Sequence, residues 1–134
     1  MKVNKKIGII GALDEEINIF LKIIKKIKIK KWSEFCFYEG KIFNQEVVVV
    51  KTGVGKTSAA MVCQKMIDNY NLSAIIFTGV AGSVNKKLNI GDVIISSDCV
   101  HHDLEAIELG FLRGVIPYTK YRFFRADEKL KKIA

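Results

Sequence analysis

Short apolar runs that each end at a glycine are the feature that most constrains the fold of this chain. The runs cover residues 6–10, 46–52 and 73–78, and Gly11, Gly53 and Gly79 follow them. Runs of this length are typical of strands that are buried on both faces of a sheet. Helical periodicity appears between the runs. The alternation predicts an α/β domain with helices on both faces of its sheet.

Two helices and a hairpin are predicted between these runs. The first helix opens on Asp14, and its apolar positions recur at steps of three and four residues as far as Ile27. Lysines gather toward its end, where they complement the helix dipole. The second helix is predicted over residues 56–70. Residues 34–42 and 46–52 are predicted to form the two strands of the hairpin.

The C-terminal third of the sequence has a looser pattern. Residues 91–98 predict one more strand, and residues 101–124 predict a loop-rich excursion. Asp127 is a candidate N-cap for a final helix. No stop signal closes this helix before Ala134. We therefore expect residues 1–134 to be a single domain that lacks its C-terminal part.

Composition narrows the class of protein. With 134 residues, 49% of them hydrophobic and 27% charged, the chain is typical of one globular domain. It contains no apolar run of the roughly 18 residues that a membrane span needs, so no membrane partner is expected. The odd count of three cysteines, at wide spacing and without a CxxC pair, indicates reduced thiols in a cytoplasmic protein.

The formal net charge of +8 raises the question of an anionic partner. The densest basic segment is KIIKKIKIKK at residues 22–31. It has no interleaved aromatic residues and no recognition motif, and lysine and isoleucine are abundant along the whole chain. Charge alone therefore predicts no specific nucleic-acid partner.

Two motifs suggest a cofactor or a metal, but neither has the required pattern. GVGKTS at residues 53–58 resembles a phosphate-binding P-loop, yet Val50 occupies the position of the first glycine. A turn that leads into a helix explains these glycines. His101 and His102 are adjacent, so on an extended chain they point in opposite directions and do not share one ion. We expect neither a cofactor nor a metal.

The acidic triplet Asp14-Glu15-Glu16 follows the first predicted strand. Carboxylates in the first turn of a helix stabilise the helix dipole, which is one explanation. The triplet also lies at the carboxyl edge of the predicted sheet, where open α/β sheets bind their ligands. The residues alone leave both explanations open.

Several segments together resemble one family. They are IGIIGALDEEI (7–17), KTGVGKTSAA (51–60), FTGVAGSVNKKLNIGDVIIS (77–96), HHDLEAIELGF (101–111), VIPY and FRADEKL. In order and spacing they resemble the 5′-methylthioadenosine/S-adenosylhomocysteine nucleosidases, within the wider purine nucleoside phosphorylase class. The resemblance implies a three-layer α/β/α sandwich around a mixed central sheet, and a homodimer when the protein is complete.

The resemblance also implies a reaction and a set of residues. The substrate would be an adenine nucleoside, whose N-glycosidic bond is hydrolysed through an oxocarbenium-like transition state to release adenine. Glu16 would hold and activate the attacking water. The positions that match the nucleoside pocket are Val54, Val80, Ala81 and Gly82. The segment that lines the 5′-alkylthio pocket of the partner subunit is matched by Ala106, Leu109 and Pro117.

The family's chains continue well beyond the length seen here. The resemblance assigns the acid that protonates adenine and the glutamate that grips the ribose to that further part, so an inactive fragment is one expectation for this chain. Two alternatives stay open. One is another phosphorylase or hydrolase of the superfamily, and the other is a truncated, non-catalytic basic binding protein.

Overall fold

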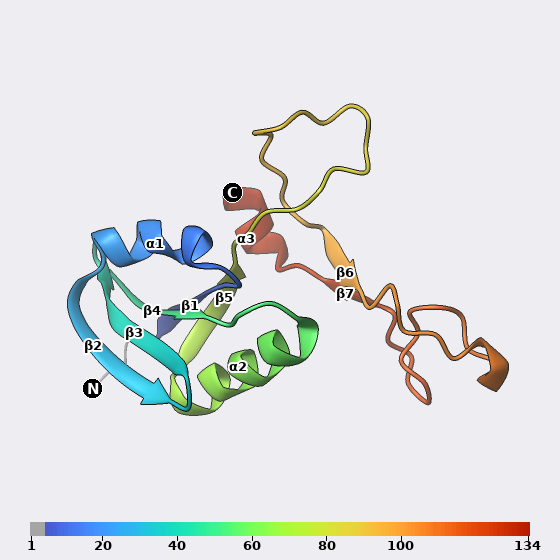
Figure 1. Ribbon diagram of the computed structural model, residues 1–134, viewed down its shortest axis with the longest axis horizontal. Coiled ribbons are helices and arrows are strands. Elements are labelled where there is room, and N and C mark those ends of the chain that lie inside the picture. Colours follow the sequence, from blue (N-terminus) through green and yellow to red (C-terminus); the bar gives the residue numbers. More distant parts are fainter. Residues whose placement is uncertain (1–4) are drawn as a thin grey trace. The chain divides into compact units, whose positions relative to one another are not determined.

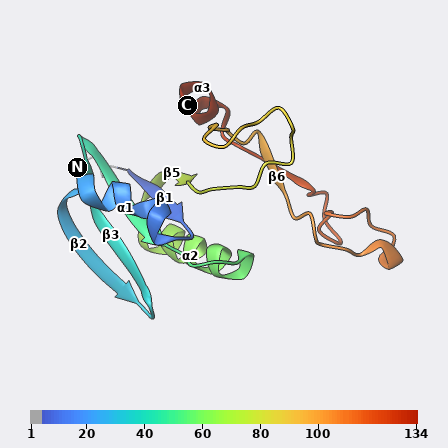
Figure 2. The ribbon, with the colours of Figure 1, turned by 45° about the horizontal axis from the view of Figure 1, so that its top comes forward.

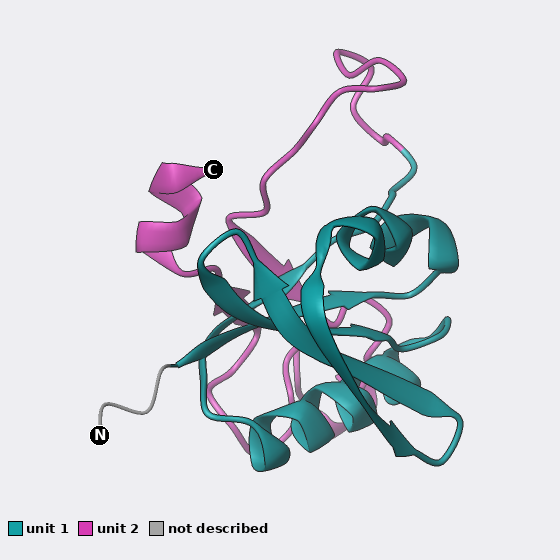
Figure 3. Cartoon of the chain, turned by 90° about the vertical axis from the view of Figure 1, so that its left-hand side faces the viewer, with its two compact units in different colours: residues 1–82 teal, residues 83–134 magenta. Residues whose placement is uncertain are grey.

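The computed structural model describes residues 5–134, which belong to two compact units (Figure 3). The first unit ends at Gly82, and the second runs from Ser83 to Ala134. The first unit contains a five-stranded sheet with two helices, whereas the second contains a two-stranded sheet, long loops and a short helix.

The first unit is built on a mixed sheet with the strand order β2-β3-β4-β1-β5 (Figure 1). Strand β1 is parallel to both of its neighbours, β4 and β5, while β2 and β3 are antiparallel additions at one side. The strand bounds are β1 Lys6–Gly11, β2 Lys25–Trp32, β3 Phe35–Ile42, β4 Gln45–Lys51 and β5 Leu72–Phe77. The predicted hairpin is confirmed as β3 and β4.

Strand β4 forms the middle of the hydrophobic core. Its four consecutive valines, residues 47–50, are each at most 2% exposed. Val48 and Val50 belong to the cluster that contains α2 (Lys56–Asn69), and the other two valines belong to the cluster that contains α1 (Asp14–Ile23). Because successive side chains of a strand point to opposite faces, the two helices cover opposite faces of the sheet (Figure 2). The predicted layering and the predicted second helix are confirmed.

This topology creates a crevice at the carboxyl edge of the sheet. Strands β1 and β4 are adjacent and parallel, and the helices that follow them lie on opposite faces. Open α/β sheets bind ligands at such a switch point, because the two connections diverge and leave space between them.

The first helix is shorter than predicted, and this expectation was wrong. Helix α1 ends at Ile23, and the lysine-rich segment that was assigned to its end forms strand β2. Residues 26–30 alternate lysine with isoleucine, which is a period of two and suits a strand. A Cβ on Gly40 of β3 would lie 2.5 Å from the Lys25 carbonyl oxygen, so this glycine lets β2 approach β3 closely.

The strand predicted at residues 91–98 is also wrong over most of its length. Only Asp98–Val100 forms a strand, β6, which pairs with β7 (Phe123–Arg125). Val93 is 91% exposed and Ile94 is 63% exposed. A strand needs a neighbour for its backbone N–H and C=O groups, and no described strand pairs with residues 91–97.

The second unit is loop-rich, as predicted. Between β6 and β7 the chain forms one short 3₁₀ helix, Ile107–Leu109, and a series of turns. The final helix α3 spans Glu128–Ile133, and Asp127 caps it by accepting hydrogen bonds from the backbone N–H groups of Lys129 and Leu130. The predicted N-cap is therefore confirmed. Within residues 5–134, no helix is both long enough and apolar enough to cross a membrane.

Two methionines of α2 test this description of the core. Met66 is fully buried, whereas Met61 on the same helix is 45% exposed. We expect Met66→Ala to lower the free energy of unfolding by about 2–5 kcal/mol, because it opens a cavity against β1 and β4. Met61→Ala should lower it by less than about 1 kcal/mol. Urea denaturation measures both values, and equal losses would contradict the assignment of Met66 to the core.

Candidate active site

Glu16 lies at the carboxyl edge of the sheet, in the first turn of α1, and its side chain is half-buried. Its Oε2 accepts hydrogen bonds from the backbone N–H groups of Ala12 at 2.6 Å and Leu13 at 3.0 Å. Its Oε1 accepts a third from the backbone N–H of Val80 at 3.0 Å. Three amides from two separate segments therefore hold this carboxylate.

Helix capping explains only part of this arrangement. A glutamate at the third helical position commonly reaches back to the N-cap amide, and the bond from Leu13 is of this kind. The bond from Val80 is different, because that amide lies 64 residues away, after β5. The contact thus joins the loop after β1 to the loop after β5.

Hydrogen bonds to its charged form keep Glu16 ionised. The N–H group of Leu13 is the largest cause that lowers the pKa of Glu16, and the N–H groups of Ala12 and Val80 add to it. Partial burial works in the opposite direction but does not cancel these bonds. Glu16 is therefore a fixed negative charge at neutral pH that accepts protons weakly.

Backbone hydrogen bonds hold the ends of the three parallel strands together. The N–H of Thr52 donates to the Gly11 carbonyl at 2.9 Å, and the N–H of Thr78 donates to the Ile10 carbonyl at the same distance. The loops that follow β1, β4 and β5 thus begin side by side. The predicted residues Val54, Val80, Ala81 and Gly82 all lie on the second and third of these loops.

Of those four predicted residues, Val80 donates a hydrogen bond to Glu16 through its backbone N–H. The side chains of Val54 and Val80 are 81% and 82% exposed, and Ala81 and Gly82 are exposed as well. A Cβ on Gly82 would meet no atom within 4 Å.

The motif GVGKTS forms a turn and the start of α2, as predicted. Gly53 and Gly55 have φ values of 72° and 114°, a left-handed region that favours glycine. The Ser58 hydroxyl donates to the Thr52 carbonyl and ties the helix start to the end of β4. This geometry explains the glycines without a bound phosphate.

A pocket of about 480 Å³ lies next to this edge on the α1 side, and sequence reasoning missed it. Its polar lining includes Asp14, Lys51 and Thr52. The Lys51 ammonium pairs with the Asp14 carboxylate at 2.7 Å. The one sign of this pocket in the sequence is the lysine at the end of β4. Only the fold places that lysine beside the first turn of α1. Glu16 does not line this pocket.

The residues predicted for the partner subunit's pocket lie in the second unit. Ala106 precedes the 3₁₀ helix, Leu109 ends it and is 64% exposed, and Pro117 is half-buried. Phe111 packs edge-to-face on Tyr118, with ring centroids 5.4 Å apart. This contact joins the two ends of the loop over residues 111–118.

The family model of the phosphorylase superfamily matches residues 6–134. The chain belongs to this superfamily. Its sequence is 37% identical over 127 residues to a 5′-methylthioadenosine/S-adenosylhomocysteine nucleosidase of Staphylococcus haemolyticus. That match covers 95% of this chain and 56% of the relative. The chain thus spans about half the length of the curated relatives it matches.

Solved structures confirm the fold. The nucleosidase of the same type from Neisseria meningitidis, crystallised with methylthio-immucillin-A, matches with a TM-score of 0.91 and 30% identity over 96% of this chain and 55% of that one. The futalosine hydrolase of Helicobacter pylori matches with a TM-score of 0.91 and 28% identity over 99% and 57%. The chain is part of a purine nucleoside phosphorylase-like α/β fold with a mixed central sheet.

Gly79 gives a direct test of how Glu16 is held. A Cβ at this position would lie 2.8 Å from Glu16 Oε1, whereas a Cβ on Gly82 would meet nothing. We expect Gly79→Ala to break the bond from the Val80 amide and to increase hydrogen exchange of that amide. Gly82→Ala is the matched control and should leave it unchanged. Continued protection of the Val80 amide in Gly79→Ala would contradict the geometry.

Proposed function

We propose that this chain forms the water-activating half of a nucleoside hydrolase, which acts on 5′-methylthioadenosine and S-adenosylhomocysteine and releases adenine. The observation that carries the proposal is the Glu16 carboxylate, held by three backbone amides at the carboxyl edge of the sheet. The superfamily match and the named nucleosidases among the relatives support the reaction class.

The hydrogen bonding of Glu16 suits it to orient a water molecule. A carboxylate offers about four acceptor sites, and three are used by backbone amides. The remaining site on Oε1 is available to a water O–H. That water would attack the anomeric carbon, its oxygen would form the new C–O bond, and Glu16 would accept one of its protons. The electron pair of the broken C–N bond would leave with adenine, which gains a proton.

A weakly basic carboxylate is adequate for this step. Positive charge develops on the sugar before the water bonds to it, so the water needs little activation. The fixed negative charge of Glu16 stabilises that developing charge. Its lowered pKa keeps it ionised and ready at neutral pH.

The charge around Glu16 favours hydrolysis over phosphorolysis. Asp14 and Glu15 share the first helical turn with it, and Lys51 is paired with Asp14. Attack by phosphate would require unpaired cations to hold the dianion. Acidic side chains in this place repel phosphate.

The proposed substrate pocket rests on the positions that match the family. Small residues at Ala81 and Gly82 let the backbone approach the nucleoside. Val54 would contact the 5′ substituent. An apolar lining at this place suits a methylthio group. We further propose a homodimer in which Ala106, Leu109 and Pro117 of one subunit line the pocket of the other.

The futalosine hydrolase match gives a second candidate substrate, because its TM-score equals that of the Neisseria nucleosidase. The two candidates share hydrolysis of an N-glycosidic bond and differ in the nucleoside. We also propose a cytoplasmic location, which the three free cysteines support. Burial raises the pKa of the Cys63 thiol, which lowers the fraction of reactive thiolate.

The test uses this chain joined to the C-terminal portion of the Staphylococcus haemolyticus relative, assayed for adenine release from 5′-methylthioadenosine without phosphate. We expect activity in the fusion. Glu16→Gln should reduce it by roughly 100-fold or more, because a neutral amide cannot accept the proton. Glu15→Gln, an exposed neighbour in the same helical turn, should stay within a few-fold of the parent.

Three outcomes of this assay would count against the proposal. Normal release by Glu16→Gln would remove Glu16 from the mechanism. A strict requirement for phosphate would identify a phosphorylase. Release from futalosine but not from 5′-methylthioadenosine would favour the second candidate substrate.

A further inference from the structure

Edge strand β2 presents an unusual amount of positive charge. It contains five lysines and no acidic residue, and all of it up to Lys31 is exposed. Among the described residues it pairs only with β3, so its other edge is open. Lysines on an edge strand discourage aggregation, which accounts for some of them. Protection against aggregation does not account for the aromatic rings that lie among these lysines.

Strand β2 and helix α2 enclose a groove of about 200 Å³, which we call the basic groove. It is defined by Lys30, Lys31 and Trp32 of β2, Lys65 of α2, and Tyr70, which caps that helix. No acidic residue is among the described residues that line it. The groove is therefore cationic along both walls.

Aromatic faces and ammonium groups alternate inside the basic groove. The Lys65 ammonium lies 5.2 Å from the centre of the Trp32 ring, and the Lys30 ammonium lies 5.1 Å from the centre of the Tyr70 ring. Trp32 also stacks on Phe35, at a centroid distance of 5.8 Å. An ammonium over a ring is held weakly at such sites, so Lys65 is free to exchange the ring for an anion.

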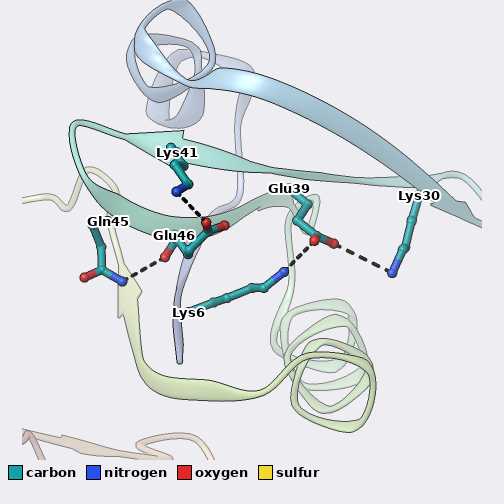
Figure 4. A network of polar contacts seen from close by, with 6 residues as sticks. All are labelled: Lys6, Lys30, Glu39, Lys41, Gln45 and Glu46. Carbon is teal, nitrogen blue, oxygen red and sulfur yellow. Dashed lines mark hydrogen bonds and ion pairs between the residues drawn. The ribbon is translucent and has the colours of Figure 1, made fainter. Parts of the chain in front are cut away.

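The acid that pairs with Lys30 does not cancel this charge. Glu39 of β3 forms an ion pair with Lys6, and its Oε2 lies 3.7 Å from the Lys30 ammonium (Figure 4). Its pKa is lowered mainly by the hydrogen bond from Lys6. Lys28 lies opposite Glu39 on the neighbouring strand. One carboxylate thus sits among three lysines, and an excess of positive charge remains beside the groove.

The position of the exposed aliphatic residues distinguishes a lipid bilayer from an anionic partner that contacts aromatic rings. Ile29 is 60% exposed, but it lies opposite Tyr38, on the face of the sheet that α1 covers. Lys30 lies opposite Phe37, on the α2 face. The groove therefore combines cations with aromatic rings and not with an aliphatic surface, which a lipid bilayer would favour.

We propose that the basic groove binds single-stranded nucleic acid without sequence preference. Lys30 and Lys65 would neutralise backbone phosphates, and a base would stack on the face of Trp32 that Lys65 covers. Cationic grooves with aromatic platforms bind single strands in this way, since every base has a π-face. Single strands also present unstacked bases, which a duplex does not.

Trp32 is the only tryptophan of the chain, so its fluorescence reports on the groove. The probe is a short oligothymidylate added to the 134-residue protein at several salt concentrations. We expect saturable quenching, with an affinity that falls as salt rises. Heparin, which is polyanionic but has no bases, should compete for the site and cause little quenching.

The double variant Lys30→Gln/Lys65→Gln should weaken oligothymidylate binding roughly 10-fold or more. It should also reduce the slope of log K against log salt by about 1.4, at about 0.7 for each phosphate contact on a single strand. The matched control is Lys86→Gln/Lys87→Gln, which removes the same charge from an exposed turn of the second unit. It should leave quenching nearly unchanged. Circular dichroism confirms that both variants fold.

Three results would overturn the proposal. Equal weakening by the two double variants would show attraction by net charge without a site. Equal quenching by heparin and oligothymidylate would show that no base contacts Trp32. Binding to anionic phosphatidylserine vesicles in the absence of oligothymidylate binding would assign the groove to a membrane surface.

Discussion

The burial of β4 on both faces is the constraint on which the rest of the first unit depends. Four consecutive valines can be removed from water only if a helix covers each face, and α1 and α2 do so. Because these helices follow adjacent parallel strands, their connections diverge at the carboxyl edge. The core and the crevice thus have one cause, and the crevice exists before any catalytic residue is considered.

Glu16 lies at the same carboxyl edge, where we propose that it orients the attacking water. Its carboxylate joins the loop after β1 to the loop after β5, and the amides that hold it also fix its charge. An ionised group held by backbone amides need not move when positive charge develops nearby. Such a preorganised site avoids the free-energy cost of reorganisation. The same chain presents a second, chemically different surface between β2 and α2, where cations alternate with aromatic rings.

Sequence reasoning succeeded where the pattern was local and failed where a partner strand decided the structure. The glycine-terminated runs, α2 and the Asp127 cap follow from periodicity and capping chemistry. Strand β2 was missed because its isoleucines also fit a helical period, and pairing with β3 decided between the two. The contact between Glu16 and Val80 is invisible in sequence, since only the parallel pairing of β1 with β5 brings these segments together.

A carbon-13 NMR titration of the Glu16 carboxyl group tests directly whether three amides hold this group as an anion. We expect a pKa below the ordinary glutamate value, with the amide protons of Ala12, Leu13 and Val80 shifting at the same midpoint. The stability that these bonds contribute would then be present at neutral pH and lost as pH falls through that midpoint. A midpoint at or above the ordinary value, or amides that do not follow it, would contradict the fixed charge of Glu16 on which the proposed hydrolysis rests.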